Sequence, residues 1–286
     1  RKFSIRSRDE VISMHGGWAA SAPDTMQVNL SGYDISTLNA FIGKNYGIAG
    51  RLTGHAMIVS PTDSRAGILM NMVCDSAAFG GHGLGTLKIA GVWDESRKGF
   101  NYVLRNSMDN IQNIYAFGNY FPQTKSIEGK LSLNALDMGY ATPFVKSIFD
   151  EFGGKLSGDI AFIGPVDNVD IASRGLRIDG GRLRIGFTNV AYNVDGPLDM
   201  NDLGLNFNGL SITDRFGNKG SVNGKIGWKG FRDIRFDTGI TFSSLEVINS
   251  SESQSPMFYG NVSATGRLDI TGPVHALSLN ASAMTE

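Results

Sequence analysis

The sequence predicts a mainly β fold: an elongated, curled antiparallel sheet that forms an open groove with an apolar interior, plus one or two short amphipathic helices. Short runs alternate apolar and polar residues with a period of two, as in 176–179 and 182–185. Glycine is abundant, at 37 of 286 residues, and it bounds many of these runs. Similar strand units also recur along the chain, which is typical of stacked repeats.

The clearest strand signal surrounds Gly180-Gly181, which separates two alternating runs and predicts a two-residue hairpin turn. The register of that hairpin places Ile178 opposite Leu183 and Leu176 opposite Ile185. One face of the hairpin is then apolar and the other is charged, as a sheet with one covered face requires. Comparable turn signals occur at Asn208-Gly209, Asp195-Gly196 and Gly217-Asn218.

Two segments break the period of two. Residues 142–152 carry apolar groups at helical spacing, with Thr142 as the expected N-cap, Pro143 in the first turn and Gly153 beyond the end. We expect a short amphipathic helix there. A weaker helical pattern covers residues 34–46.

A repeat follows each of these two helical patterns. Gly50–Val59 aligns with Gly154–Ile163 at an offset of 104, and Gly266–Pro273 matches Gly158–Pro165 at an offset of 108. We therefore expect two β-groove repeats. The first spans residues 1–122 with its helix near 34–46, and the second spans residues 123–286 with its helix near 142–152.

The charge balance excludes one large class of partner. The chain carries 26 basic and 27 acidic side chains, a formal net charge of −1, so it lacks the basic surface that binds nucleic acid. The single Cys74 excludes an intramolecular disulfide and any Cys-x-x-Cys metal or redox site. We expect no nucleic acid partner.

Catalytic and cofactor motifs are weak throughout the chain. The four histidines are scattered without a second ligand at metal-binding spacing, and the run Gly80–Gly85 lacks the dinucleotide-binding fingerprint. We expect no metal, no organic cofactor and no enzymatic activity. A β-solenoid enzyme acting on polysaccharide is an alternative, because a pair of carboxylates could serve it. The acidic residues concerned, which also suit turns, are Asp195, Asp199, Asp202 and Asp214.

Apolar residues are expected to share one face of successive strands and to line the groove. The expected lining residues are Leu52, Ile58, Leu156, Ile160, Phe162, Leu176, Ile178, Leu183, Ile185, Phe187, Leu205, Phe207, Val222, Ile226, Trp228, Leu268 and Ile270. Periodicity is compatible with two interpretations of this face. It could fill the closed core of a β scaffold or adhesion module, or it could form an open wall that acyl chains cover.

Three segments carry a family resemblance: Gly154–Ile160, Gly175–Ile185 and Leu210–Ile226. The most specific part is the Asp214-x-x-Gly-Asn218 turn followed by a strand with spaced glycines. From about residue 128 to 286 the sequence resembles the C-terminal region of the TamB family, within the AsmA-like group of lipid-transfer proteins. The first half is similar only through its helical pattern and the strand Gly50–Gly54.

The resemblance implies a β-taco groove in the periplasm of Gram-negative bacteria, within a protein anchored in the inner membrane. It implies lipid transport between the membranes or assistance to outer-membrane protein assembly. The implied partners are phospholipid, or another ligand with acyl chains, and an outer-membrane TamA-like or BamA-like barrel. The chain begins with Arg1, and we expect it to be an excerpt whose membrane anchor lies elsewhere in a longer polypeptide.

Overall fold

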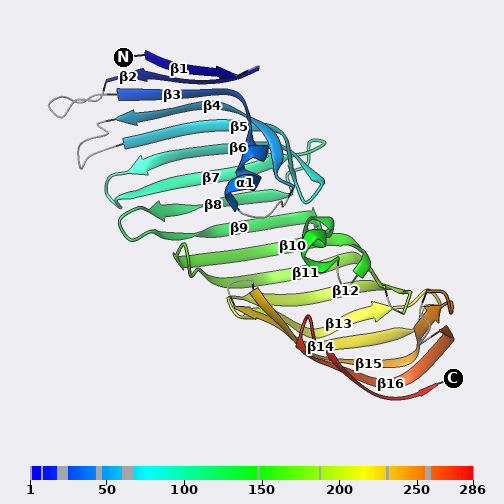
Figure 1. Ribbon diagram of the computed structural model, residues 1–286. Coiled ribbons are helices and arrows are strands. Elements are labelled where there is room, and N and C mark those ends of the chain that lie inside the picture. The colour runs from blue at the N-terminus through cyan, green and yellow to red at the C-terminus, as the bar shows by residue number, and fades with distance from the viewer. Residues whose placement is uncertain are drawn as a thin grey trace. The chain divides into compact units, whose positions relative to one another are not determined.

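The computed structural model describes residues 2–7, 9–17, 25–42, 47–59, 67–146, 149–186, 188–229, 232–254 and 259–285. It contains a single antiparallel sheet of 17 strands that is not closed, which confirms the predicted fold class (Figure 1). The strands are β1 (Lys2–Ser7), β2 (Glu10–Gly16), β3 (Thr25–Asp34), β4 (Ala49–Val59), β5 (Gly67–Phe79), β6 (His82–Asp94), β7 (Gly99–Ser107), β8 (Ile114–Phe121), β9 (Ser126–Asp137), β10 (Phe149–Pro165), β11 (Asp170–Ile185), β12 (Val190–Asn201), β13 (Gly204–Thr213), β14 (Lys219–Lys229), β15 (Arg232–Ser250), β16 (Gly260–Pro273) and β17 (Ser278–Thr285).

The chain divides into two compact units. Unit 1 comprises residues 1–132 and 162–169, and unit 2 comprises residues 133–161 and 170–286. This division separates parts of β9 and β10, whereas the two domains expected from the sequence, 1–122 and 123–286, are contiguous.

Helical turns occur in both segments where the sequence pattern predicts a helix, but the second helix is shorter than expected. The first segment contains η1 (Ile35–Thr37) and α1 (Leu38–Ile42), and residues 43–46 lie outside the described chain. The second contains η2 (Met138–Ala141) and α2 (Thr142–Val145), and β10 already begins at Phe149. The expected helix at 142–152 is therefore wrong over its second half. Thr142 is not the N-cap, because Ala141 holds that position without a side-chain bond.

Aspartates start both helical segments. The Asp34 carboxylate accepts a hydrogen bond from the Ser36 amide at 2.9 Å, and this bond holds the pKa of Asp34 below its usual range. The Asp137 carboxylate likewise accepts from the Gly139 amide at 2.8 Å. Each aspartate satisfies an amide that the short helical turn would leave without a partner.

The predicted hairpin at Gly180-Gly181 is wrong. Strand β11 continues through both glycines and pairs with β12 on either side of a β-bulge between Ile178 and Gly181. Gly180 takes a φ of +56°, which a bulge needs and which glycine adopts without steric cost. Asn208-Gly209 and Asp195-Gly196 also lie within strands at bulges, whereas Gly217-Asn218 forms a true turn between β13 and β14.

The bulge still places the predicted apolar residues of β11 on one face, although no hairpin forms. An extra residue in a strand reverses the alternation, so even-numbered positions before the bulge and odd-numbered positions after it share a face. Leu176 lies opposite Leu198 before the bulge, and Leu183 lies opposite Tyr192 after it. The bulge at Gly209 does the same in β13, where Phe207 and Leu210 end on one face.

A repeated hydrogen bond supports the sequence repeat. In three strand pairs, a residue with positive φ donates its amide to a hydroxyl on the following strand, just before a glycine. The bonds join Gly32 to Thr53 at 3.0 Å, Ala135 to Ser157 at 3.0 Å, and Ser244 to Thr265 at 2.8 Å. Thr53 and Ser157 occupy equivalent places in the aligned segments, and Thr265 directly precedes the third segment. Each hydroxyl satisfies a backbone amide that a bulge removes from the ladder.

One face of the unit 1 sheet is apolar across seven strands. The register from β2 to β8 aligns a continuous row of Ile12, Leu30, Gly54, Met72, Ile89, Leu104 and Ala116. Leu52 lies opposite Cys74 and Ile58 opposite Ile68 on the same face. The opposite face carries polar and charged residues at alternate positions, together with exposed apolar side chains such as Leu69, Val92, Val103 and Phe117.

Candidate functional site

The apolar face of unit 2 contains a cavity of about 410 Å³. It lies between the helical segment that follows β9 and the strands from β10 to β14. Its lining residues are Leu136, Asp137, Met138, Tyr140, Ala141, Val145, Phe149, Phe152, Gly153, Leu156, Ile160, Leu176, Ile178, Gly181, Arg182, Leu183, Val194, Leu198, Met200, Leu205, Phe207, Leu210, Ile226 and Trp228. Nearly all of these side chains are apolar, and the volume falls within the usual range of small-molecule sites.

Strand register builds one wall of this cavity. A continuous row crosses unit 2 through Leu176, Leu198, Phe207, Gly224, Thr238, Ile270 and Leu279. Strand β12 shows why the wall is apolar, since its buried positions, such as Val194 and Leu198, alternate with more exposed ones from Val190 to Asp199. Leu176 and Leu198 are buried, whereas Phe207 and Ile226 are half-buried and face the cavity.

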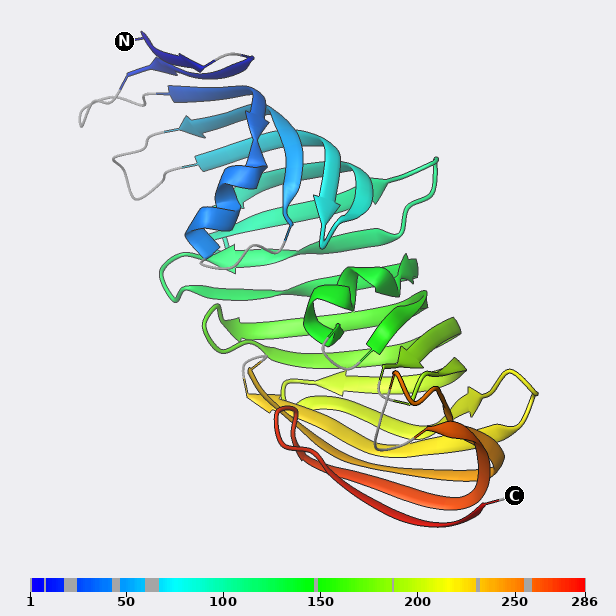
Figure 2. The ribbon, with the colours of Figure 1, turned by 45° about the vertical axis from the view of Figure 1, so that its right-hand side comes forward.

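The helical segment from η2 to α2 forms the other wall, and it lies over the first strands of unit 2 (Figure 2). Met138, Tyr140 and Val145 contribute side chains to the cavity. Burial raises the pKa of Tyr140, and the nearby Asp137 carboxylate adds to this shift, so the phenol stays neutral. At the start of β10, Phe149 and Phe152 stack with ring centroids 5.8 Å apart and extend this wall.

Two of the residues that line the cavity are charged, Asp137 and Arg182, and we call this part of the lining the rim. The Glu151 carboxylate pairs with Arg182 at 2.8 Å and with Arg184 at 3.3 Å. Asp137 pairs with Lys155 at 3.4 Å. These side chains are partly exposed, so the pairs contribute little to stability. They place ionic groups in water beside an apolar interior.

One end of unit 2 is filled rather than open. Val190, Tyr192 and Leu245 are almost completely buried, at 0%, 7% and 2% exposure. The hydroxyl of Tyr192 donates to the backbone oxygen of Glu246 at 2.7 Å, which ties β12 to β15. Burial, together with the carboxylates of Glu246 and Asp214, raises the pKa of Tyr192 far above its usual value.

A buried carboxylate organises the same end. Asp214 is 2% exposed and accepts hydrogen bonds from the amides of Phe216, Asn218 and Glu246 and from the Asn218 side chain. Burial alone would raise the pKa of Asp214, but these bonds together hold it below its usual range. Asp214 thus joins the β13–β14 turn to β15.

The cavity brings together many of the residues expected to line a groove. These are Leu156, Ile160, Leu176, Ile178, Leu183, Leu205, Phe207, Ile226 and Trp228. Val222, Leu268 and Ile270 lie on the same face by register but outside the cavity. Ile185 lies opposite the fully buried Val190, beside the filled end.

The remaining expected residues lie elsewhere. Leu52, Ile58 and Phe162 belong to unit 1, and Phe187 lies outside the described residues. The structure adds lining residues that sequence reasoning missed, above all on the helical segment and on β12. The alternation of Val194, Leu198 and Met200 could have revealed the latter. Arg182, on the charged rim, gave no comparable signal.

Within the described ranges, no three His, Cys, Asp or Glu side chains cluster closely enough to hold a metal ion. No helix in the part of the chain that the structure describes has the length and hydropathy to span a bilayer.

The fold and cavity define a class of protein: an open antiparallel β-sheet with an apolar cavity on one face. No family model, curated protein or solved structure matches the chain.

Proposed function

We propose that the cavity of unit 2 binds the acyl chains of phospholipid. The observation that carries this proposal is the wall itself: half-buried apolar side chains such as Phe207 and Ile226 border empty space instead of packing in a core. Contact between this apolar surface and water is unfavourable in free energy, and an apolar ligand that covers the surface removes that contact.

The free energy available from such binding is substantial. Each methylene group moved from water into an apolar site contributes about 0.8 kcal/mol. A stretch of about ten methylenes would therefore gain about 8 kcal/mol before the loss of ligand freedom is counted. At the rim, Arg182 shares the Glu151 carboxylate with Arg184, so one carboxylate serves two cations and positive charge remains for a phosphate headgroup.

In the wider proposal, the chain is a periplasmic segment of a TamB-like envelope protein anchored in the inner membrane. It would conduct phospholipid between the inner and outer membranes, or assist outer-membrane protein assembly beside a TamA-like or BamA-like barrel. The resemblance of residues 128–286 supports this wider role, and the apolar cavity supports its lipid-binding part. The role is passive and non-enzymatic, and it involves no cofactor.

A second candidate is a closed-core β scaffold or adhesion module. The filled end of unit 2, with Val190 and Leu245 buried, favours it over part of the sheet. In that case the apolar face serves stability alone. The two candidates predict different effects on stability and lipid binding when a charged side chain is introduced into the cavity.

Native mass spectrometry of the purified chain tests the proposal through Phe207→Arg. Because Phe207 is half-buried at the cavity, the arginine can reach solvent while its charge enters the lipid path. We expect the wild-type chain to retain phospholipid, and Phe207→Arg to lose it while its melting temperature stays close to the wild-type value.

The matched control is Asn208→Arg, at the next position along β13. Asn208 is exposed and lies opposite Asn223 on the polar face, so this variant should keep its phospholipid. Equal phospholipid content in both variants would contradict the proposal. Unfolding of Phe207→Arg would favour the closed-core scaffold, because an unpaired buried charge is strongly destabilising.

A further inference from the structure

Two cations face each other on the polar side of unit 1. Lys88 on β6 lies directly opposite Arg105 on β7, and both side chains are exposed. Like charges at opposing positions of an antiparallel pair destabilise it, because the side chains are only about 5 Å apart at Cβ. This arrangement calls for an anion between them.

The protein does not supply that anion from the residues the structure describes. No ion pair or hydrogen bond in the described ranges involves the side chain of Lys88 or Arg105. One acid, Asp75 on β5, lines the same surface depression as the two cations, but no ion pair within the described ranges joins it to either of them. It accepts a hydrogen bond from the Thr86 hydroxyl at 3.3 Å and lies opposite Arg51.

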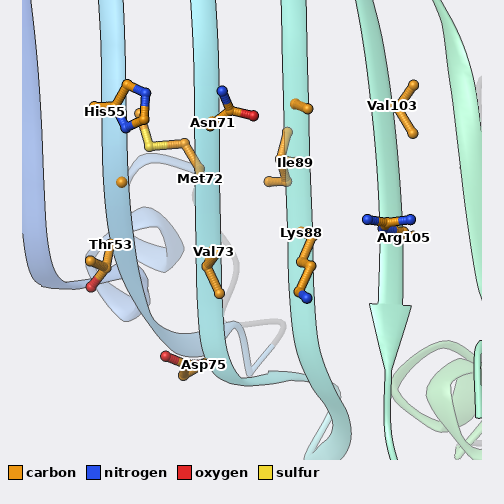
Figure 3. Close-up of a pocket in the computed structure, with 12 residues that line it drawn as sticks. Thr53, His55, Asn71, Met72, Val73, Asp75, Lys88, Ile89, Val103 and Arg105 are labelled. Atoms are coloured by element: carbon orange, nitrogen blue, oxygen red, sulfur yellow. The ribbon is translucent and has the colours of Figure 1, made fainter. Parts of the chain in front are cut away.

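Lys88 and Arg105 border two surface depressions. The larger has a volume of about 670 Å³, and Thr53, His55 and Asn71 also line it. Figure 3 shows Lys88 and Arg105 on neighbouring strands beside Val73 and Val103. The smaller, about 270 Å³, adds Ser107, Asn110 and Gln112. Both cations can therefore reach one bound group.

Arg105 is held on a rigid part of the sheet. Its neighbour Asn106 is 2% exposed. The Asn106 side-chain oxygen accepts from the amides of Asn113 and Ile114 at 2.9 and 2.7 Å, and its nitrogen donates to Leu84 at 3.1 Å. These bonds fix the loop that forms the smaller depression, so little ordering is needed when a ligand binds.

We propose that Lys88 and Arg105 form a binding site for a phosphate group. The guanidinium of Arg105 matches two phosphate oxygens, and the ammonium of Lys88 adds a point charge. Hydroxyl and amide side chains, including Thr53 and Asn71, suit the hydroxyl groups of a phosphate ester. The ligand class is a small organic phosphate, either free or as a lipid headgroup.

This site is independent of the acyl-binding cavity. It belongs to unit 1, whereas the cavity belongs to unit 2. Lys88 also alternates with Leu87 and Ile89, which lie on the apolar face. Glycerol phosphate has no acyl chain, so the part of its binding that depends on Lys88 and Arg105 reports on this site and not on acyl-chain binding in the cavity.

The test is calorimetric titration of the full chain with glycerol phosphate at constant ionic strength. We expect saturable binding to the wild-type chain. The double variant Lys88→Gln/Arg105→Gln should bind at least about tenfold more weakly, because each cation makes charge-assisted hydrogen bonds. Without phosphate, its melting temperature should equal or exceed the wild-type value, because the repulsion is gone.

The matched control is Arg174→Gln/Lys219→Gln, which removes the same net charge from exposed positions of unit 2. It should bind glycerol phosphate like the wild-type chain. Equal weakening in the control and the double variant, or no binding to the wild-type chain, would overturn the proposal. Vesicles of phosphatidylglycerol then separate the two sources. If the vesicles capture the wild-type chain but not the Lys88→Gln/Arg105→Gln variant, the ligand is a lipid headgroup. If the chain binds glycerol phosphate but not the vesicles, the ligand is a free organic phosphate.

Discussion

Replacing Asp214 by alanine is expected to lower the free energy of unfolding by about 3 to 5 kcal/mol. The substitution removes the acceptor of hydrogen bonds from Phe216, Asn218 and Glu246 at a site that is 2% exposed. The Glu246 amide would remain buried without a partner, and the tie between the β13–β14 turn and β15 would be lost. Urea denaturation followed by circular dichroism measures the change.

The same carboxylate makes stability depend on pH. The pKa of Asp214 is lower in the folded chain than its usual value, so its contribution is present at neutral pH. That contribution is lost as the pH falls below about 4, through the folded pKa. The stability difference between the wild type and Asp214→Ala should therefore shrink in acid.

Asp202→Ala is the matched control for both measurements. Asp202 is exposed in the turn between β12 and β13, so its removal should change stability by less than about 0.5 kcal/mol. Equal stability of Asp214→Ala and Asp202→Ala at neutral pH would show that the buried network does not hold the filled end together.

Leu245→Ala should destabilise unit 2 by about 2 to 5 kcal/mol. Leu245 is 2% exposed and lies opposite Ala264, which is 4% exposed. Truncation leaves a cavity among strands that cannot fully collapse, because Tyr192 and its hydrogen bond to Glu246 hold β12 and β15 at their present spacing. Chemical denaturation of the full chain reports the loss.

Leu203 provides the comparison for this prediction. It is 69% exposed, so Leu203→Ala removes the same atoms without opening a cavity. Its effect should stay within about 0.5 kcal/mol. A loss for Leu245→Ala as small as that for Leu203→Ala would mean that this end of unit 2 is not a packed core.

The sequence predicted the β class and the apolar face, but not the way the strands are joined. Gly180-Gly181 illustrates the limit. Glycines with positive φ serve both a hairpin turn and a bulge, and both place Leu176 and Ile185 on one face. Only the pairing of β11 with β12 distinguishes a bulge from a hairpin turn, and the local sequence pattern does not specify that pairing.

The helical pattern at 142–152 failed for a similar reason. Its spacing suits a helix, but the structure ends the helix at Val145 and begins β10 at Phe149. Phe149 and Phe152 then stack against each other and line the cavity from a strand. Tertiary packing outweighs a local preference when an apolar surface is available to cover.

The cavity could be predicted only in part. Strand residues such as Phe207 and Ile226 follow from alternation, because a shared face brings them together. The helical wall, with Met138 and Tyr140, depends on how a segment folds back over the sheet, which no local pattern encodes. Whether the apolar face forms an open wall or a filled core also depends on the curvature of the sheet. Unit 2 contains both an open wall and a filled core.

Photo-crosslinking tests the central claim most directly. A photoreactive phenylalanine analogue at position 207 would lie in the cavity, and the same analogue at position 208 would lie on the polar face. After incubation with phospholipid vesicles and irradiation, mass spectrometry should find acyl-chain adducts at position 207 and none at position 208. Equal labelling at both positions, or no adduct at position 207, would contradict acyl-chain binding in the cavity.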